Sequence, residues 1–173
     1  MSAGPASPPG WRGGVDRVVR RFREAPGAVQ DRVIGATLAV PAAVVLGTAL
    51  WLEPDPSGVG THQQLGLGGC TVLTTFGVPC PMCGMTTTFT HLAHLHVVDG
   101  VVNQPFGVVL FGLTVLGLLT GAADLVRPAG RWRRLIAVVD QNEGTIASVI
   151  LLGMFGGWAW KWAVMSGQLP SSP

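Results

Sequence analysis

The residues best suited to chemistry lie in GVPCPMCGMTTTF, residues 77–89, where Cys80 and Cys83 are separated by two residues. Two thiols at this spacing can exchange electrons, bind a metal ion or close a small disulfide loop. The third cysteine of the chain, Cys70, precedes them in the same uncharged stretch. All four histidines also fall between residues 53 and 105, at His62, His91, His94 and His96. This concentration places any chemistry of the chain in that one segment.

A disulfide is the simplest interpretation of these cysteines. Cys70 could bond to Cys80 or to Cys83, or the two clustered cysteines could bond to each other, and spacing does not decide among these connectivities. Thiol–disulfide exchange is a second interpretation, because Cys83 precedes an expected helix whose N-terminal N–H groups would stabilise a thiolate. Exchange motifs of this spacing usually follow a β-strand, however, and no segment here has a strand pattern. We therefore favour a structural or reversible disulfide over catalysis and expect no catalytic residue.

A metal site is the third interpretation, with zinc as the expected ion. A closed zinc site takes four ligands, and Cys80 and Cys83 would supply two of them. His91 and His94 lie about one turn apart on one face of the expected helix and would supply the others. The chain would have to fold back on itself to join the two pairs. His96 instead falls on the apolar face of that helix, so we expect a core histidine with a local hydrogen bond.

The composition indicates a membrane protein. Hydrophobic residues make up 48% of the chain and charged residues only 12%, whereas about 25% of the residues of a soluble domain are charged. Apolar runs long enough to cross a bilayer occur at residues 33–52, 106–123 and 145–165. In lipid, backbone polar groups must be satisfied within each segment, so these runs predict helices. We therefore expect an all-α membrane protein, with a basic, cytoplasmic, partly disordered segment at 1–32 and a membrane domain at 33–173.

The arginines predict the orientation of the chain in the cell membrane. Six arginines precede the first span, none occurs in the loop at 53–105, and four occur in the loop at 124–144. Because basic residues stay in the cytoplasm, the N-terminus should be inside, and the CPMCG loop and the C-terminus outside. Oxidised thiols are permitted in that outer compartment. Lys161 should extend its ammonium group to the outer head groups, beside tryptophans expected at the same interface, Trp158, Trp160 and Trp162.

The outer loop should contain one short helix after the cysteine motif. Residues 85–98 have an amphipathic pattern too short to cross the bilayer, so this helix should lie in the outer interface or pack on the spans. Asp99 and Gly100 should end it, Asn103 should cap the second span, and Pro105 should occupy the first turn of that span. The polar face of the short helix should face water or head groups; it comprises Thr87, Thr90, His91 and His94.

Smaller features complete the expected fold. Residues 1–14 should be disordered, a surface helix should follow at 15–31, and Pro41 should kink the first span. The terminal Ser-Ser-Pro, residues 171–173, should be a free tail. The second span carries glycines at spacings that suit close helix contact, which are Gly107, Gly112, Gly117 and Gly121.

The cysteine segment resembles a bacterial membrane-protein family, the domain-of-unknown-function family 2752. That family has a CP-x-CG-x-T motif, then a short helix, then an asparagine and a proline before an apolar helix. Thr87 stands where many members have arginine, and Gln104 separates the asparagine from the proline. The resemblance implies a small integral membrane protein and brings no established activity, substrate or cofactor. The matching residues here are Cys80, Pro81, Cys83, Gly84, Thr86, Phe89, Asn103 and Pro105.

These observations together predict a small non-catalytic membrane module. Its outward CPMCG loop, held by a disulfide, would dock another membrane protein or a second copy of the chain within the lipid bilayer. Membrane-tethered thiol–disulfide exchange and Cys/His metal binding are the alternatives. A nucleic-acid partner is not expected, because the basic N-terminal segment has few aromatic residues and no recognisable binding fold.

Overall fold

The computed structural model of the chain describes residues 9–168, and every regular element in that part is helical. Three of the described helices, α2, α6 and α8, are long and apolar enough to cross a membrane. The all-α fold with three membrane-spanning helices, predicted from composition, is therefore confirmed. In chain order the elements are α1 (Pro9–Glu24), α2 (Gly27–Trp51), η1 (Thr61–Leu65), α3 (Thr71–Phe76), α4 (Met85–Ala93), α5 (Val97–Asn103), α6 (Pro105–Val126), α7 (Arg131–Gln141) and α8 (Glu143–Met165).

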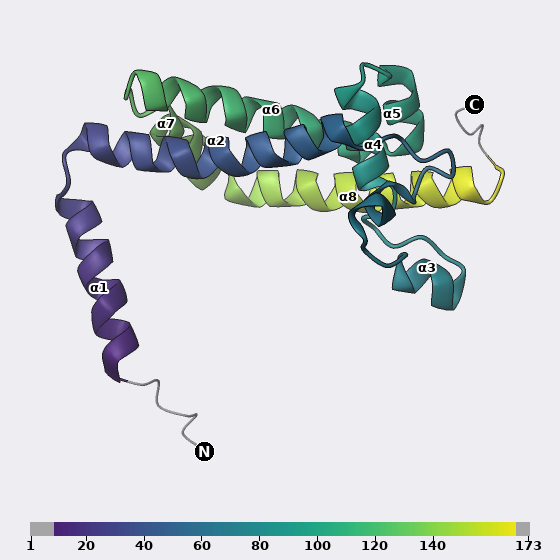
Figure 1. Ribbon diagram of the computed structural model, residues 1–173, viewed down its shortest axis with the longest axis horizontal. Coiled ribbons are helices and arrows are strands. Elements are labelled where there is room, and N and C mark those ends of the chain that lie inside the picture. The colour runs from purple at the N-terminus through teal and green to yellow at the C-terminus, as the bar shows by residue number, and fades with distance from the viewer. Residues whose placement is uncertain (1–8, 169–173) are drawn as a thin grey trace.

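The three long helices lie lengthwise in one bundle, with α4 and α5 at one end and α7 at the other (Figure 1). Helices α2 and α6 are in close backbone contact where Gly35 meets Gly121. A Cβ atom added to Gly121 would lie 2.6 Å from the carbonyl oxygen of Gly35, so only glycine fits there. Such small residues let transmembrane helices pack backbone to backbone. Many large apolar side chains of the long helices are exposed, as suits contact with lipid.

The first span is longer than expected at its start. Helix α2 begins at Gly27 and not at Val33, and it continues through Pro41 without interruption. The chain breaks at Ala25 and Pro26, so the surface helix α1 ends at Glu24. The disorder predicted for residues 1–14 is wrong for 9–14, which are helical, while 1–8 and the 171–173 tail lie outside the described residues.

Two buried carboxylates hold the α7 end of the bundle together, and helix α7 itself was not predicted. Asp31 of α2 accepts a hydrogen bond from Trp132 Nε1 at 3.1 Å and pairs with Arg133 at 3.0 Å. Asp124 of α6 pairs with Arg131 at 2.7 Å. These contacts fasten the start of α7 to both long helices. Two of the arginines that predict orientation thus also make specific ion pairs.

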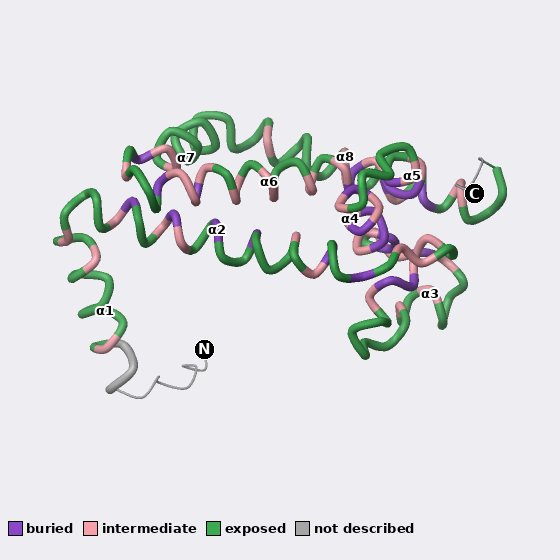
Figure 2. The backbone as a smooth tube through the Cα atoms, turned by 45° about the horizontal axis from the view of Figure 1, so that its top comes forward, coloured by how far each residue is buried: buried purple, intermediate pink, exposed green. Residues whose placement is uncertain are grey.

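At the opposite end, α4 and α5 form a helical pair, and many buried residues lie in and around α4 (Figure 2). The prediction of a single helix at 85–98 is wrong, because α4 ends at Ala93 and Leu95 has a left-handed φ of 63°. The expected end at Asp99 and Gly100 is also wrong, since α5 runs through both. Gly100 lies against α4, where an added Cβ would be 3.0 Å from the Leu92 side chain. The chain therefore folds back into two short packed helices.

The threonine face of α4 is buried, contrary to the expectation that it faces water. Thr61 Oγ1 of η1 donates a hydrogen bond to Thr87 Oγ1 at 2.9 Å. Asn103 Nδ2 donates to Thr88 Oγ1 at 2.9 Å. Each threonine hydroxyl at this interface is therefore paired, which removes most of the cost of burying it. Periodicity alone does not reveal that polar partners lie on neighbouring segments.

Candidate functional site

The CPMCG loop is fastened to the bundle through its backbone carbonyl groups. Trp158 Nε1 of α8 donates to the carbonyl oxygen of Pro79 at 2.7 Å. The side chain of Gln104 donates to the carbonyl of Pro81 at 3.5 Å, and Asn103 donates to that of Gly84 at 3.0 Å. The asparagine that follows the motif in the sequence therefore holds the motif in place. These bonds fix the backbone that carries Cys80 and Cys83.

Gly84 is required by both backbone conformation and space. It precedes α4 with φ of 82°, in the left-handed region that favours glycine. A Cβ atom there would lie 2.7 Å from the carbonyl oxygen of Gly58 and 3.1 Å from both Asn103 Nδ2 and Lys161 Cε. The glycine of the CPMCG motif therefore lets the loop, the 53–60 segment and α8 meet at one point.

Lys161 is buried below this loop, with 2% of its surface exposed. Its Nζ donates to Asn103 Oδ1 at 2.6 Å and to the carbonyl oxygen of Gly58 at 3.0 Å. The prediction that its ammonium group reaches the head groups is therefore wrong. The physical reason is that two oxygen acceptors from distant segments converge on the ammonium group and replace its water.

Asn103 does not cap the second span, because its side chain is turned toward Lys161. Gln104 takes that role, since its Oε1 accepts a hydrogen bond from the N–H of Phe106 at 3.2 Å. Pro105 lies in the first turn of α6, as predicted. Among the other motif residues, Phe89 makes an edge contact with Phe111 at a ring-centroid distance of 5.3 Å.

The three cysteines form one cluster. Their sulfur atoms all lie within 4.8 Å of one another, and all three are free thiols. Cys70 and Cys80 are half-buried, while Cys83 is 5% exposed. The N–H of Cys80 donates to the Sγ atom of Cys83 at 3.2 Å. The fold therefore brings Cys70, which directly precedes α3, onto the Cys80–Cys83 turn.

The thiols of Cys70 and Cys83 differ in acidity. A hydrogen bond from the backbone N–H of Leu73 is the main cause that lowers the pKa of Cys70 to about 7. Burial raises the pKa of Cys83 to about 12. The expectation that the following helix stabilises a Cys83 thiolate is therefore wrong, because desolvation disfavours the charged form more strongly. Cys70, which the sequence analysis did not single out as a nucleophile, ionises more readily than Cys83.

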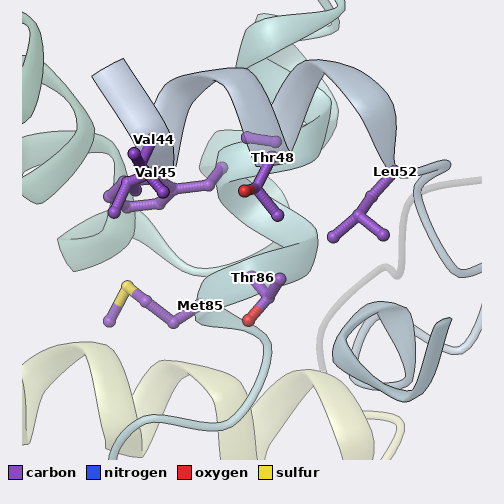
Figure 3. A pocket seen from close by; sticks show the side chains of 8 residues that line it. Val44, Val45, Thr48, Leu52, Met85 and Thr86 are labelled. Atoms are coloured by element: carbon purple, nitrogen blue, oxygen red, sulfur yellow. The ribbon is translucent and has the colours of Figure 1, made fainter. Parts of the chain in front are cut away.

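A cavity of about 310 Å³ lies at the cysteine cluster. All three cysteines line it, together with His62, whereas the three other histidines do not. A second cavity of about 310 Å³ lies between α2 and α4 and has apolar walls such as Val44 and Leu52 (Figure 3). Met85 and Thr86 line both cavities and form the wall between them.

The histidines proposed as zinc ligands do not join the cysteines. His91 lies with His96 and Asp99, where one potential ligand atom from each falls within 4.8 Å of the others. His94 Nδ1 lies 2.9 Å from the carbonyl oxygen of Thr90. His96 is exposed, so its predicted place in the core is wrong, because the left-handed turn before it carries it out of the α4 face. Residues 9–168 therefore contain two separate groups of potential ligands.

The fold and this site define a small multi-pass membrane protein with a three-cysteine cluster at one end of its helices. Residues 70–118 match the model of the family described as "Protein of unknown function (DUF2752)". The resemblance predicted from the CPMCG motif is thereby confirmed. The matched segment begins at Cys70 and contains all three cysteines. No curated protein and no solved structure matches the chain.

Proposed function

We propose that this chain is a membrane module in which a disulfide between Cys70 and Cys80 fixes the CPMCG loop and α3 as a docking surface for another membrane protein. The convergence of three sulfur atoms within 4.8 Å is the observation that carries the proposal. Cys70 and Cys80 are the two that remain accessible, whereas Cys83 is buried. The Cys70–Cys80 bond would link residues 66–78, which include α3, to the CPMCG loop. The backbone of that loop is already bound by Trp158 of α8 and by Asn103.

The bond forms by thiol–disulfide exchange with a protein or small-molecule disulfide of the outer compartment. The Cys70 thiolate attacks that disulfide, which forms a mixed disulfide and releases one thiolate. The Cys80 thiolate then attacks the Cys70 sulfur and releases the second thiolate, so the protein loses two electrons and the oxidant gains them. Closing a loop of this size stabilises a fold by about 3 kcal/mol in the chain-entropy account.

The docking surface is the exposed apolar part of the same segment. Leu67, Phe76 and Met82 are 57%, 73% and 53% exposed. The sequence has no charged residue between Asp55 and Asp99, so this surface carries no charge that an apolar partner would have to desolvate. Exposed apolar surface of this kind is typical of sites that contact proteins or membranes. The arginine distribution supports placing it outside the cell membrane.

Thiol alkylation of the protein, purified without reductant or chelator, tests the disulfide. We expect two cysteines to resist alkylation until reduction, with peptide mapping assigning the bond to Cys70 and Cys80. Three reactive thiols would contradict the proposal. Elemental analysis of the same sample then separates the alternatives, because bound zinc near one per chain would favour a site made by the three cysteines and His62.

Affinity capture from native membranes tests the docking surface. A tagged wild-type chain should recover one stoichiometric membrane protein, and Phe76→Ser should lose it. Val98→Ser, which changes a similarly exposed apolar residue on α5, is the matched control and should retain the partner. A clean monomer in mild detergent, or equal recovery with Phe76→Ser, would contradict docking at α3.

Thiol–disulfide exchange with a client is the second candidate function, favoured by the accessible and acidic Cys70. The reduction potential of the cysteine cluster distinguishes thiol–disulfide exchange from a structural disulfide. A potential near that of the surrounding thiol pool supports exchange, whereas a potential far below that pool supports a structural bond.

A further inference from the structure

We propose that His91, His96 and Asp99 form a divalent metal site that is separate from the cysteine cluster. Each residue offers one ligand atom, and these three atoms lie within 4.8 Å of one another. Two imidazoles and one carboxylate suit zinc and other first-row divalent ions. This inference concerns a different group of side chains and does not depend on the proposed disulfide.

A tight turn at the end of α4 creates this group. Leu95 has a left-handed φ of 63°, which is uncommon for a residue with a branched side chain. The turn lets the N–H of His96 donate to the carbonyl oxygen of His91 at 2.8 Å. The two imidazole rings consequently lie 6.1 Å apart between centroids. The first turn of α5 then brings Asp99 to the same place.

His91 supplies an independent sign that a ligand belongs here. Its Nδ1 atom is buried and has no hydrogen-bond partner in the part of the chain that the structure describes. A buried polar atom without a partner is unfavourable, and such atoms are rare in folded proteins.

The other two groups are free to turn toward an ion. His96 is exposed, and Asp99 forms no ion pair or side-chain hydrogen bond within the described residues. Ligand atoms about 2.0–2.2 Å from a zinc ion lie about 3.3–3.6 Å apart in tetrahedral geometry. The three atoms now lie within 4.8 Å of one another, so rotations of the His96 and Asp99 side chains would bring them to this spacing. A fourth position would remain for water or for a group of another molecule.

Zinc binding to the full chain in mild detergent tests the site, with a tag that contains no histidine. The background is Cys70→Ser/Cys80→Ser/Cys83→Ser, which removes every thiol ligand. We expect this variant to bind one Zn²⁺ per chain in calorimetry. Adding His96→Gln should weaken the affinity by at least ~10-fold, as should Asp99→Asn. His94→Gln is the matched control, because His94 lies outside the proposed ligand set, and should leave the affinity unchanged.

Retained helical circular dichroism and an unchanged elution volume establish that each variant is folded. His96 is exposed, so its replacement should not disturb packing. Asp99→Asn is a second variant that tests the same site. No zinc binding by the thiol-free variant would overturn the proposal. Equal affinity with and without His96→Gln, or an equal loss in His94→Gln, would also overturn it.

Discussion

The Nζ atom of Lys161 lies 2.6 Å from Oδ1 of Asn103, and both side chains are buried. Asn103 in turn donates to the carbonyl oxygen of Gly84, the residue that closes the CPMCG motif. The single lysine of the sequence therefore connects α8 to the cysteine loop through one asparagine. Its second bond, to the carbonyl oxygen of Gly58, adds the 53–60 segment to the same network.

Lys161→Met should destabilise the protein. It removes the ammonium group and leaves Asn103 Oδ1 and the Gly58 carbonyl without their donor, at about 1–3 kcal/mol for each buried group. Thermal unfolding in detergent should show a lower midpoint. Leu152→Met, at an exposed position of the same helix, is the control and should change the midpoint little. An unchanged or higher midpoint for Lys161→Met would show that the network contributes no stability.

Gly84→Ala should be far more damaging than Gly77→Ala. Both glycines have left-handed φ values, 82° and 69°, so both substitutions incur about 1–2 kcal/mol of backbone strain. A Cβ at Gly84 also meets the carbonyl oxygen of Gly58 at 2.7 Å, whereas nothing lies within 4 Å at Gly77. The comparison uses unfolding midpoints together with alkylation rates of Cys80. Similar effects of the two substitutions would argue against the close contact at Gly84.

Gly121→Ala should weaken the contact between α2 and α6. The new methyl group would meet backbone atoms of Gly35 and Ala39, which cannot move without separating the helices. Gly117→Ala is the matched control on the same helix, because nothing lies within 4 Å of that position. Unfolding midpoints should fall for the first variant and stay level or rise for the second. The opposite order would mean that the helices pack through another face.

The reactivity of reduced Cys70 should depend on pH with an inflection near 7. Its pKa is lowered to about 7, chiefly by the N–H of Leu73, so the thiolate fraction rises as pH increases through that value. Iodoacetamide rates measured by mass spectrometry should follow this curve, and denatured protein should show an inflection near ~8.5. Cys83 should stay unmodified when folded, because burial raises its pKa to about 12. Identical curves for folded and denatured Cys70 would contradict this environment.

The coarse fold was predictable because hydrophobic length alone identifies helices that cross a membrane. The three apolar runs correspond to α2, α6 and α8, with the largest difference, six residues, at the start of α2. Local chemistry was also sufficient for Pro105, whose fixed φ suits a first helical turn. The predicted glycine contacts were half correct. Gly107 and Gly121 touch neighbouring segments, whereas Gly112 and Gly117 have open space around them.

The polar interior was not predictable, because it depends on partners that are distant in the sequence. Lys161 and Asn103 are separated by 58 positions, and Thr61 and Thr87 by 26. A helical pattern assigns such residues to the water-facing side, since it contains no information about acceptors on other segments. The left-handed turn at Leu95 was hidden for a similar reason, because leucine gives no local turn signal. The grouping of His91 with His96 follows from that turn.

Labelling of whole cells with a membrane-impermeant maleimide tests the central claim, that the cysteine cluster is an outward-facing disulfide. Intact cells should show no labelled Cys70 or Cys80 at first, and both should become labelled after an impermeant reductant is added. Labelling of these cysteines without reduction would contradict the disulfide. Labelling that requires lysis would contradict the outward orientation.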